Sequence, residues 1–203
     1  APGRLASFIV TDGDPLETLM SEAVPQATRN AVARTLHELL FREMFEFGFM
    51  QTDPNSANYL YLPATGQLAL LDLGSACEYK KDFVEHYRQV CRAVIARDRA
   101  GIREAAFALG YASPEDPEEM VRGTVEIMEL VCEPLAHRGP YDFGNSGLIG
   151  RARDLGMALA FRSGLRSPPP ETIFLHRKLL GNFLICARLR ARVNVHALIE
   201  RFV

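Results

Sequence analysis

The sequence lacks the features that mark membrane spans, secretion signals and cysteine-based metal sites. No apolar run reaches 18 residues, so no transmembrane helix is predicted. The opening stretch, APGRLASFIV, has neither a basic start nor a long apolar core, and it is not typical of a secretion signal. Four cysteines are scattered without a CxxC pair. They predict reduced thiols in an intracellular protein, not a disulfide framework or a zinc site.

The chain also has no excess of charge of one sign. Its 23 lysines and arginines face 25 acidic residues, giving a net charge of −2, so no overall field recruits nucleic acid. The five histidines are far apart and lack ligand spacing, which argues against a histidine metal site. At 203 residues, with no internal repeat, the chain fits one domain or one large lobe.

The hydrophobic pattern predicts a mostly helical chain with one β-hairpin. Apolar residues recur at steps of three and four from Gln26 to Phe47, which predicts a long amphipathic helix ended by Gly48. Residues 58–62 and 67–72 flank the turn-forming quartet PATG and predict a hairpin. Everything after Tyr79 is expected to be helical. The predicted fold class is α+β, predominantly helical, with its polar site at the hairpin.

Three oxygen-bearing side chains gather around this hairpin, in the stretch FMQTDPNSANYLYLPATGQLALLDLGSA. A tight hairpin returns its two ends to neighbouring positions, so Asn58 and Asp72 are expected side by side. An amide oxygen and a carboxylate suit Mg²⁺, with phosphate oxygens and water completing the shell. Asp53 then stands where an attacking hydroxyl or water is oriented. Each residue alone also fits an ordinary turn, and only their joint pattern favours the site.

This spacing resembles the catalytic layout of protein kinases, in which an Asp is followed five positions later by an Asn and, after a hairpin, by a DFG-type Asp. Here the first motif reads Gln51-Thr52-Asp53 and the second reads Asp72-Leu73-Gly74. The arginine that usually precedes the first Asp is missing, and no Ala-Pro-Glu segment follows. The sequence therefore argues against an ordinary protein kinase.

The resemblance becomes specific with FEFGFMQTDPNSANYLY and GQLALLDLGSACEY, and it continues through PYDFG, PPPET and LHRKLLGNFLICARLRAR. These segments resemble the UbiB or ABC1-like atypical kinases, which are associated with coenzyme Q. The resemblance implies that Asp53 is the catalytic aspartate and that Asn58 and Asp72 bind Mg²⁺ and nucleotide. Gly74, the glycine after the metal-binding aspartate, is implied to be part of the cofactor-binding site as well, and Leu73 replaces a phenylalanine. The implied cofactors are Mg²⁺ and ATP or ADP.

The same resemblance implies a preceding lobe that the sequence does not contain. In the family that lobe carries an alanine-rich phosphate loop, a Lys–Glu pair and a KxGQ segment. The chain is thus expected to be the C-terminal lobe alone. Residues 1–24 would form a hinge strand, at 4–10, and a linker helix. Residues 25–79 would hold the catalytic helix, loop and metal hairpin, and residues 80–203 a helical subdomain.

Two functions from different classes follow from this interpretation. One is an atypical kinase or ATPase that binds Mg-nucleotide and supports ubiquinone biosynthesis. The other is a catalytically inactive lobe that binds protein or lipid. Aminoglycoside- and choline-type phosphotransferases share the Asp-x4-Asn arrangement, but they usually carry a His where this chain has Gln51 and an Asp where it has Gly74. That third interpretation ranks below the others.

The expected partners are nucleotide, anionic lipid or lipid-like quinone precursors, and other ubiquinone-biosynthesis proteins, but no nucleic acid. The expected location is intracellular. It would be cytoplasmic and peripheral to the membrane in a bacterium, or mitochondrial in a eukaryote.

Three further segments give expectations of their own. Four phenylalanines between Phe41 and Phe49 are expected in the core around the catalytic loop. The basic residues from Arg177 to Arg192 are expected on a solvated helix face, with contact to anionic lipid as the alternative. For His176-Arg177-Lys178 a buried tie to the YDFG segment is the other possibility. Tyr141-Asp142-Phe143-Gly144 is expected to cap a helix without following a strand.

Overall fold

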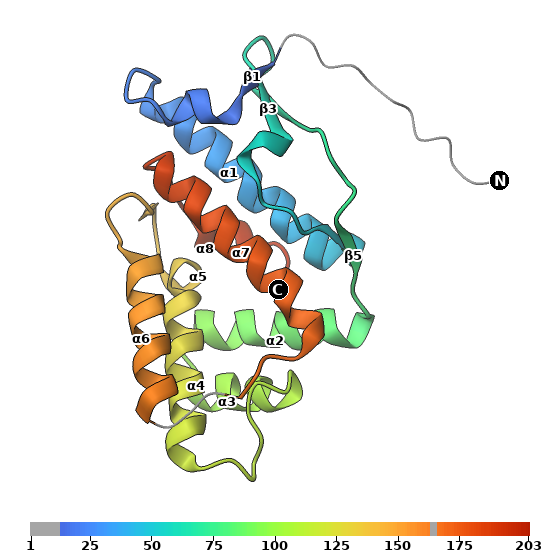
Figure 1. Ribbon diagram of the computed structural model, residues 1–203, viewed down its shortest axis with the longest axis vertical. Helices are drawn as coiled ribbons and strands as arrows, with labels where there is room; N and C mark the ends of the chain where they lie inside the picture. Colours follow the sequence, from blue (N-terminus) through green and yellow to red (C-terminus); the bar gives the residue numbers. More distant parts are fainter. Residues whose placement is uncertain (1–12, 163–165) are drawn as a thin grey trace, which may run out of the picture.

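The computed structural model describes residues 13–162 and 166–203, and most of this part of the chain is helical (Figure 1). The strand expected at residues 4–10 lies outside the described residues. The helices are α1 (Gln26–Arg42), α2 (Lys81–Ala96), α3 (Arg99–Ala108), α4 (Glu118–Val131), α5 (Glu133–Ala136), α6 (Leu148–Arg162), α7 (Pro170–Arg188) and α8 (Val195–Ile199). The strands are β1 (Asp14–Pro15), β2 (Phe49–Gln51), β3 (Tyr59–Leu62), β4 (Gln67–Leu70), β5 (Ala76–Glu78), β6 (Tyr141–Asp142) and β7 (Arg192–Val193).

The long helix predicted before the catalytic loop is confirmed. Helix α1 continues into one π-helical turn, Glu43–Phe47, and the chain then reverses at Gly48, whose φ is 61°. This left-handed conformation is open to glycine and costs other residues about 1–2 kcal/mol. The short segment after β1 also folds as expected, into a 3-10 helix at Leu16–Met20.

The predicted hairpin is confirmed as β3 and β4, which pair antiparallel with Tyr59 opposite Leu70. β1 joins β3 on its other edge, so the hairpin belongs to a sheet in the order β1-β3-β4. Two further short pairings hold distant segments together. β2, which precedes the hairpin in the sequence, pairs with β5, which follows it, and β6 pairs with β7. Within the described residues the hairpin is thus part of one of three small sheets. The expectation that only helices follow Tyr79 was wrong, because β6 and β7 lie in that region.

The helices pack in two groups, each around its own core (Figure 1). In the first group, α7 and α8 lie against α1, and the core includes Leu16, Leu175 and Ile199, all almost fully buried. In the second, α2, α3 and α4 enclose a smaller core around Ile102. Each such aliphatic side chain contributes about 1.5–3 kcal/mol when it leaves water. The site described next lies where the first group meets the hairpin.

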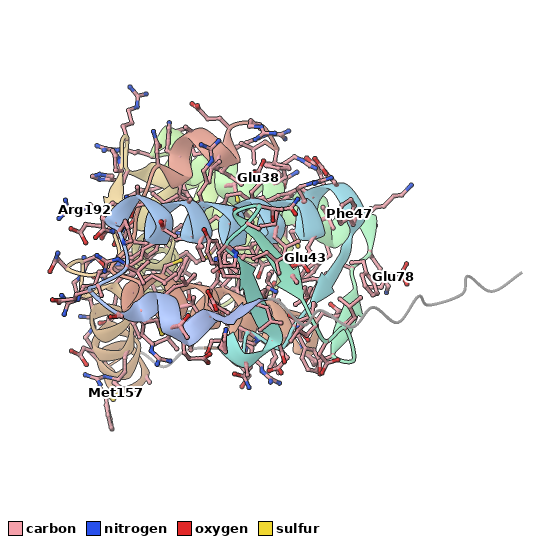
Figure 2. The ribbon with its side chains drawn as sticks, turned by 90° about the horizontal axis from the view of Figure 1, so that it is seen from above. Glu38, Glu43, Phe47, Glu78, Met157 and Arg192 are labelled. Atoms are coloured by element: carbon pink, nitrogen blue, oxygen red, sulfur yellow. The ribbon has the colours of Figure 1, made fainter. Side chains whose placement is uncertain are left out.

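The packing leaves some large apolar side chains outside. Met157 on α6 points away from the body of the molecule (Figure 2) and is 50% exposed. Two of the four phenylalanines expected in the core are also outside. Phe41 and Phe45 pack inward, whereas Phe47 and Phe49 flank the turn at Gly48 and are half exposed. Within the described residues, we find no helix with both the length and the apolar character that crossing a bilayer requires.

Candidate active site

The loop that carries Asp53 is tied to the segment that follows the hairpin. β2 leads into the loop and pairs with β5, which begins just after the Asp72-Leu73-Gly74 motif. The backbone N–H and the hydroxyl of Thr52 both donate to the carbonyl oxygen of Ser75, each at 2.7 Å. Two residues separated by the whole hairpin are therefore fixed against each other, and the two sequence motifs become neighbours.

Both oxygens of the Asp53 carboxylate are hydrogen-bonded. The amide Nδ2 of Asn58 donates to Oδ2 at 2.9 Å and also lies 3.3 Å from the Asp53 carbonyl oxygen. On the other side, Nη2 of Arg177 lies 2.7 Å from Oδ1. The structure thus brings together two of the site residues expected from the sequence, Asp53 and Asn58. It adds Arg177, which arrives from α7 and which the sequence interpretation placed on a solvated face.

Asp72 lies one residue beyond the backbone pair that closes the hairpin. The N–H of Leu71 donates to the carbonyl oxygen of Asn58 at 2.9 Å, so Asp72 follows directly after the partner of Asn58. Its Oδ1 accepts the backbone N–H of Gly74 at 2.7 Å. A Cβ on Gly74 would lie 3.0 Å from this oxygen, which favours glycine at that position.

The donor chemistry of this pair fits a hard cation. The amide nitrogen of Asn58 is used by Asp53, which leaves its Oδ1 without a donor among the described residues, and Asp72 is exposed. Carboxylate and amide oxygens are the ligands that Mg²⁺ prefers, together with phosphate oxygens and water. In the part of the chain that the structure describes, no three His, Cys, Asp or Glu side chains gather to hold a metal. A cation at Asn58 and Asp72 would therefore take its further ligands from outside these side chains, such as water or phosphate oxygens.

A buried polar cluster lies beneath the catalytic loop, and the sequence interpretation missed it. The Nζ of Lys178, on α7, is 3.1 Å from Oε1 of Gln51, 3.2 Å from the hydroxyl of Tyr59 and 3.4 Å from Oε2 of Glu43. All four side chains are buried. The carboxylate of Glu43 also accepts the backbone N–H of Gln51 at 3.2 Å. One ammonium group thus joins the start of the π-helical turn, the catalytic loop, the hairpin and α7.

This cluster acts directly on the position of Asp53, because the amide Nε2 of Gln51 donates to the Asp53 carbonyl oxygen at 2.7 Å. Burial is the main cause of the pKa shifts within the Lys178 cluster. It lowers the pKa of Lys178 and raises the pKa of Glu43, and the attraction between the two opposes both shifts. Burial also raises the pKa of Tyr59. An ion pair taken this far out of water is costly to break, since the remaining charge loses its partner.

The sequence interpretation of the His176-Arg177-Lys178 segment as a solvated face holds for His176 and Arg177, which are exposed, but was wrong for Lys178. Lys178 is buried in the cluster, Arg177 binds Asp53, and His176 lies 2.7 Å from the hydroxyl of Tyr111. The buried tie considered as the alternative exists, but it runs to the catalytic loop rather than to YDFG. A signal for it was present: Lys178 falls on the same helical face as Leu175, where the period predicts an apolar residue.

An open groove of about 330 Å³ lies beside Asp53, between the catalytic loop and α7. The two walls touch closely at its base. A Cβ on Gly181 would lie only 2.1 Å from Cβ of Pro54, so α7 can seat against the loop only because residue 181 has no side chain. Arg177 and Arg188 line the groove as well.

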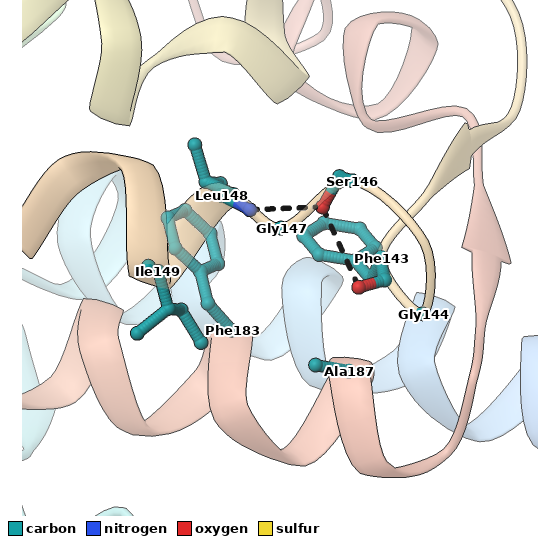
Figure 3. A pocket seen from close by; sticks show the side chains of 9 residues that line it. Phe143, Gly144, Ser146, Gly147, Leu148, Ile149, Phe183 and Ala187 are labelled. Atoms are coloured by element: carbon teal, nitrogen blue, oxygen red, sulfur yellow. Dashed lines mark hydrogen bonds between the residues drawn. The ribbon is translucent and has the colours of Figure 1, made fainter.

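The YDFG segment lies elsewhere and differs from expectation. Tyr141 and Asp142 form β6, a short strand paired with β7, so the segment does include a strand. Asp142 accepts the backbone N–H of Asn145 at 3.2 Å and does not cap α6. A small cavity of about 140 Å³ lies next to this segment, with Phe143 and Phe183 in its lining (Figure 3). Because apolar side chains and glycines form most of its lining, it offers little chemistry.

Comparison with known proteins agrees with this geometry. Residues 9–106 match the model of the ABC1 atypical kinase-like domain, a range that includes Asp53, Asn58 and Asp72. The chain is 36% identical over 197 residues to the rat protein named atypical kinase COQ8B, mitochondrial, covering 97% of this chain and 37% of that protein. It is 37% identical to the COQ8 atypical kinase of Schizosaccharomyces pombe, over 83% of this chain and 28% of the relative. The chain belongs to the UbiB or ABC1-like atypical kinase family.

The predicted fold class is confirmed along with the family. A solved structure from Mycobacterium tuberculosis, described as a complex of Rv3197 with erythromycin, superposes with a TM-score of 0.72. The alignment covers 96% of this chain and 48% of that protein at 15% identity, so the likeness is one of fold. The chain spans about a third of the length of the curated ABC1-like relatives it matches.

Proposed function

We propose that this chain is the lobe of a UbiB-like atypical kinase or ATPase that binds Mg-nucleotide and supports ubiquinone (coenzyme Q) biosynthesis. The observation that carries the proposal is the arrangement of Asp53, Asn58 and Asp72. Asp53 and Asn58 are in direct contact, and the chain at Asp72 is brought toward them by the Leu71–Asn58 backbone pair and the Thr52–Ser75 tie. This arrangement fits phosphoryl transfer, in which the protein mainly positions groups and stabilises charge.

Each residue has a role that its surroundings support. Asn58 and Asp72 would hold Mg²⁺, which when bound neutralises charge on the nucleotide phosphates. Asp53 would orient the attacking hydroxyl or water and accept its proton. Its carboxylate is fixed by one hydrogen bond on each oxygen, and its main chain is fixed by Gln51. The Lys178 cluster makes that position rigid from below.

The setting of this activity follows from the relatives. The rat, fission yeast and budding yeast proteins are named mitochondrial, and the same location is proposed for this chain if its source is a eukaryote. Anionic lipid, quinone precursors and other ubiquinone-biosynthesis proteins are the proposed partners besides nucleotide. A catalytically inactive lobe that binds protein or lipid is the alternative, and one observation favours it. Arg177 already binds Oδ1 of Asp53, so an acceptor hydroxyl would have to share that oxygen with the guanidinium group.

A thermal melt with and without millimolar Mg-ADP separates these functions. Nucleotide at a hundredfold its dissociation constant adds about 2.7 kcal/mol, which raises the Tm of a chain of this size by about 5–10 °C. The shift should need Mg²⁺ and should disappear in Asp72→Asn. The control is Asp154→Asn, which removes the same charge from an exposed ion pair on α6. No shift in the wild-type chain would contradict the nucleotide site and favour the binding module.

A further inference from the structure

The groove beside Asp53 shares that residue with the proposed nucleotide site. The two oxygens of the carboxylate face different partners: Oδ2 binds Asn58, a proposed metal ligand, and Oδ1 binds Arg177, which lines the groove. Asp53 is therefore the link between the place where phosphates would lie and an open space of about 330 Å³. That volume is within the range of small-molecule sites and is too small for a folded partner.

The walls of the groove have a definite chemical character. Apart from Asp53, which is already paired, the charged residues that line it are Arg177 and Arg188, both cations. Between them on α7 lies an apolar strip that includes Leu184, which is 43% exposed. The two arginines are eleven positions apart on α7, which corresponds to a rise of about 16 Å. Arg188 makes no hydrogen bond and no close ion pair with another described residue, although its charge acts on the carboxylate of Glu17.

The base of the groove is rigid, which suits a binding site. Gly181 allows α7 to approach Pro54 so closely that no side chain fits between them. On the loop side, Ser56 donates to Glu17 and Asn55 accepts the N–H of Ala57, so the loop is held by its own contacts. A ligand in this groove would meet fixed walls and would lose little affinity to reordering of the protein.

We propose that this groove binds the phosphoryl acceptor, and that the acceptor is a small amphiphilic anion. Its hydroxyl would lie near Asp53, its apolar part along Leu184, and its anionic group at Arg188. The proposal rests on the proposed kinase function. In the transfer, the acceptor oxygen bonds to the γ-phosphorus of ATP while the bond from that phosphorus to the β–γ bridging oxygen breaks. Asp53 takes the hydroxyl proton, and ADP leaves.

The test uses two probes and two variants of the 203-residue chain. The probes are 10-hydroxydecanoate and its uncharged counterpart 1,10-decanediol, each titrated into ¹⁵N-labelled protein. Binding is followed by the amide signals of Asp53, Asn55, Ser56 and residues 181–188. Arg188→Gln removes the proposed anion contact. Arg190→Gln is the matched control, because Arg190 carries the same charge two residues later but pairs with Glu22 and does not line the groove.

The proposal predicts that the wild-type chain binds the acid about threefold to fivefold more tightly than the diol, as one partly exposed charge contact allows. Arg188→Gln should bind both probes equally, whereas Arg190→Gln should keep the preference. The Mg-ADP shift should be the same in all three proteins.

Other results overturn the proposal. These are a preference that survives in Arg188→Gln, a preference lost equally in Arg190→Gln, or no binding at the groove. If Arg188→Gln weakens Mg-ADP as much as the acid, the groove belongs to the nucleotide. If Mg-ADP binds and the acid does not, only the acceptor site is refuted. If neither binds, the proposed function fails as well.

Discussion

Replacing Lys178 by methionine should be among the most damaging single changes in the chain. The side chain keeps its approximate length, but the ammonium group that contacts Glu43, Gln51 and Tyr59 is lost. Glu43 is 5% exposed and would keep a buried charge without its cation. Removing one partner of such a pair costs about 3–5 kcal/mol. That is a large part of the roughly 5–15 kcal/mol by which a native protein is stable.

The loss should depend on pH in a defined direction. Burial already raises the pKa of Glu43, and without Lys178 this pKa should rise further. As the pH falls, the folded variant takes up a proton on Glu43 more readily than the unfolded chain does, so the penalty should shrink. The double variant Glu43→Gln/Lys178→Met removes both charges. It should therefore be more stable at pH 8 than Lys178→Met alone.

Urea unfolding at pH 8 and pH 5.5 measures these differences. The chain has no tryptophan, so circular dichroism of the helices is the suitable signal. A double-mutant cycle over Glu43 and Lys178 then gives their coupling energy. If Lys178→Met is too unstable to fold, the double variant still reports on the pair. A stability loss below about 1 kcal/mol in Lys178→Met would refute the cluster as a coupled unit, because a loss of that size is typical of exposed ion pairs. A double variant whose stability loss equals the sum of the two single losses would refute it as well.

Three further predictions concern buried or closely packed positions. Burial lowers the pKa of His37 to about 4. Between pH 6.5 and pH 4 the imidazole is therefore protonated in the unfolded chain but not in the folded one, so the free energy of unfolding decreases as the pH is lowered. In urea titrations, His37→Phe should remove about 1.4 kcal/mol per pH unit from this pH dependence. The same pH dependence of the unfolding free energy in the wild type and the variant would contradict this prediction. Gly181→Ala should push Pro54 away and cost about 1–3 kcal/mol, with amide shifts in the catalytic loop. Gly48→Ala should cost about 1–2 kcal/mol at its φ of 61°, and an unchanged Tm would argue against the left-handed turn.

The local elements of this chain were predictable from the sequence because their signals are local. The three- and four-residue period of α1, the stop at Gly48 and the quartet PATG between two apolar runs all act within a few residues. The contact between Asp53 and Asn58 is also local, since they are five residues apart in one loop. For such features, period and turn chemistry decide the structure.

The contacts from α7 were not predicted because they join residues more than 100 positions apart. Lys178 meets Gln51 across 127 residues, and Arg177 meets Asp53 across 124. Composition presents both as ordinary basic residues of a surface helix. Their placement on that helix nevertheless differs: Lys178 is on the buried face with Leu175, and Glu43 lies on the apolar face of its own helix. A charge at a position where the helical period predicts an apolar residue was the available signal.

In the proposed function, Asn58 and Asp72 hold a divalent cation together with nucleotide. Mn²⁺ tests this proposal most directly, because this paramagnetic substitute for Mg²⁺ broadens the amide signals of nearby residues. With ADP present, the ¹H–¹⁵N spectrum should lose Asn58 and the signals from 71 to 74 first, and Asp72→Asn should restore them. Without ADP the broadening should be weaker, since phosphate oxygens complete the site. Broadening centred elsewhere, or unchanged in Asp72→Asn, would contradict the account.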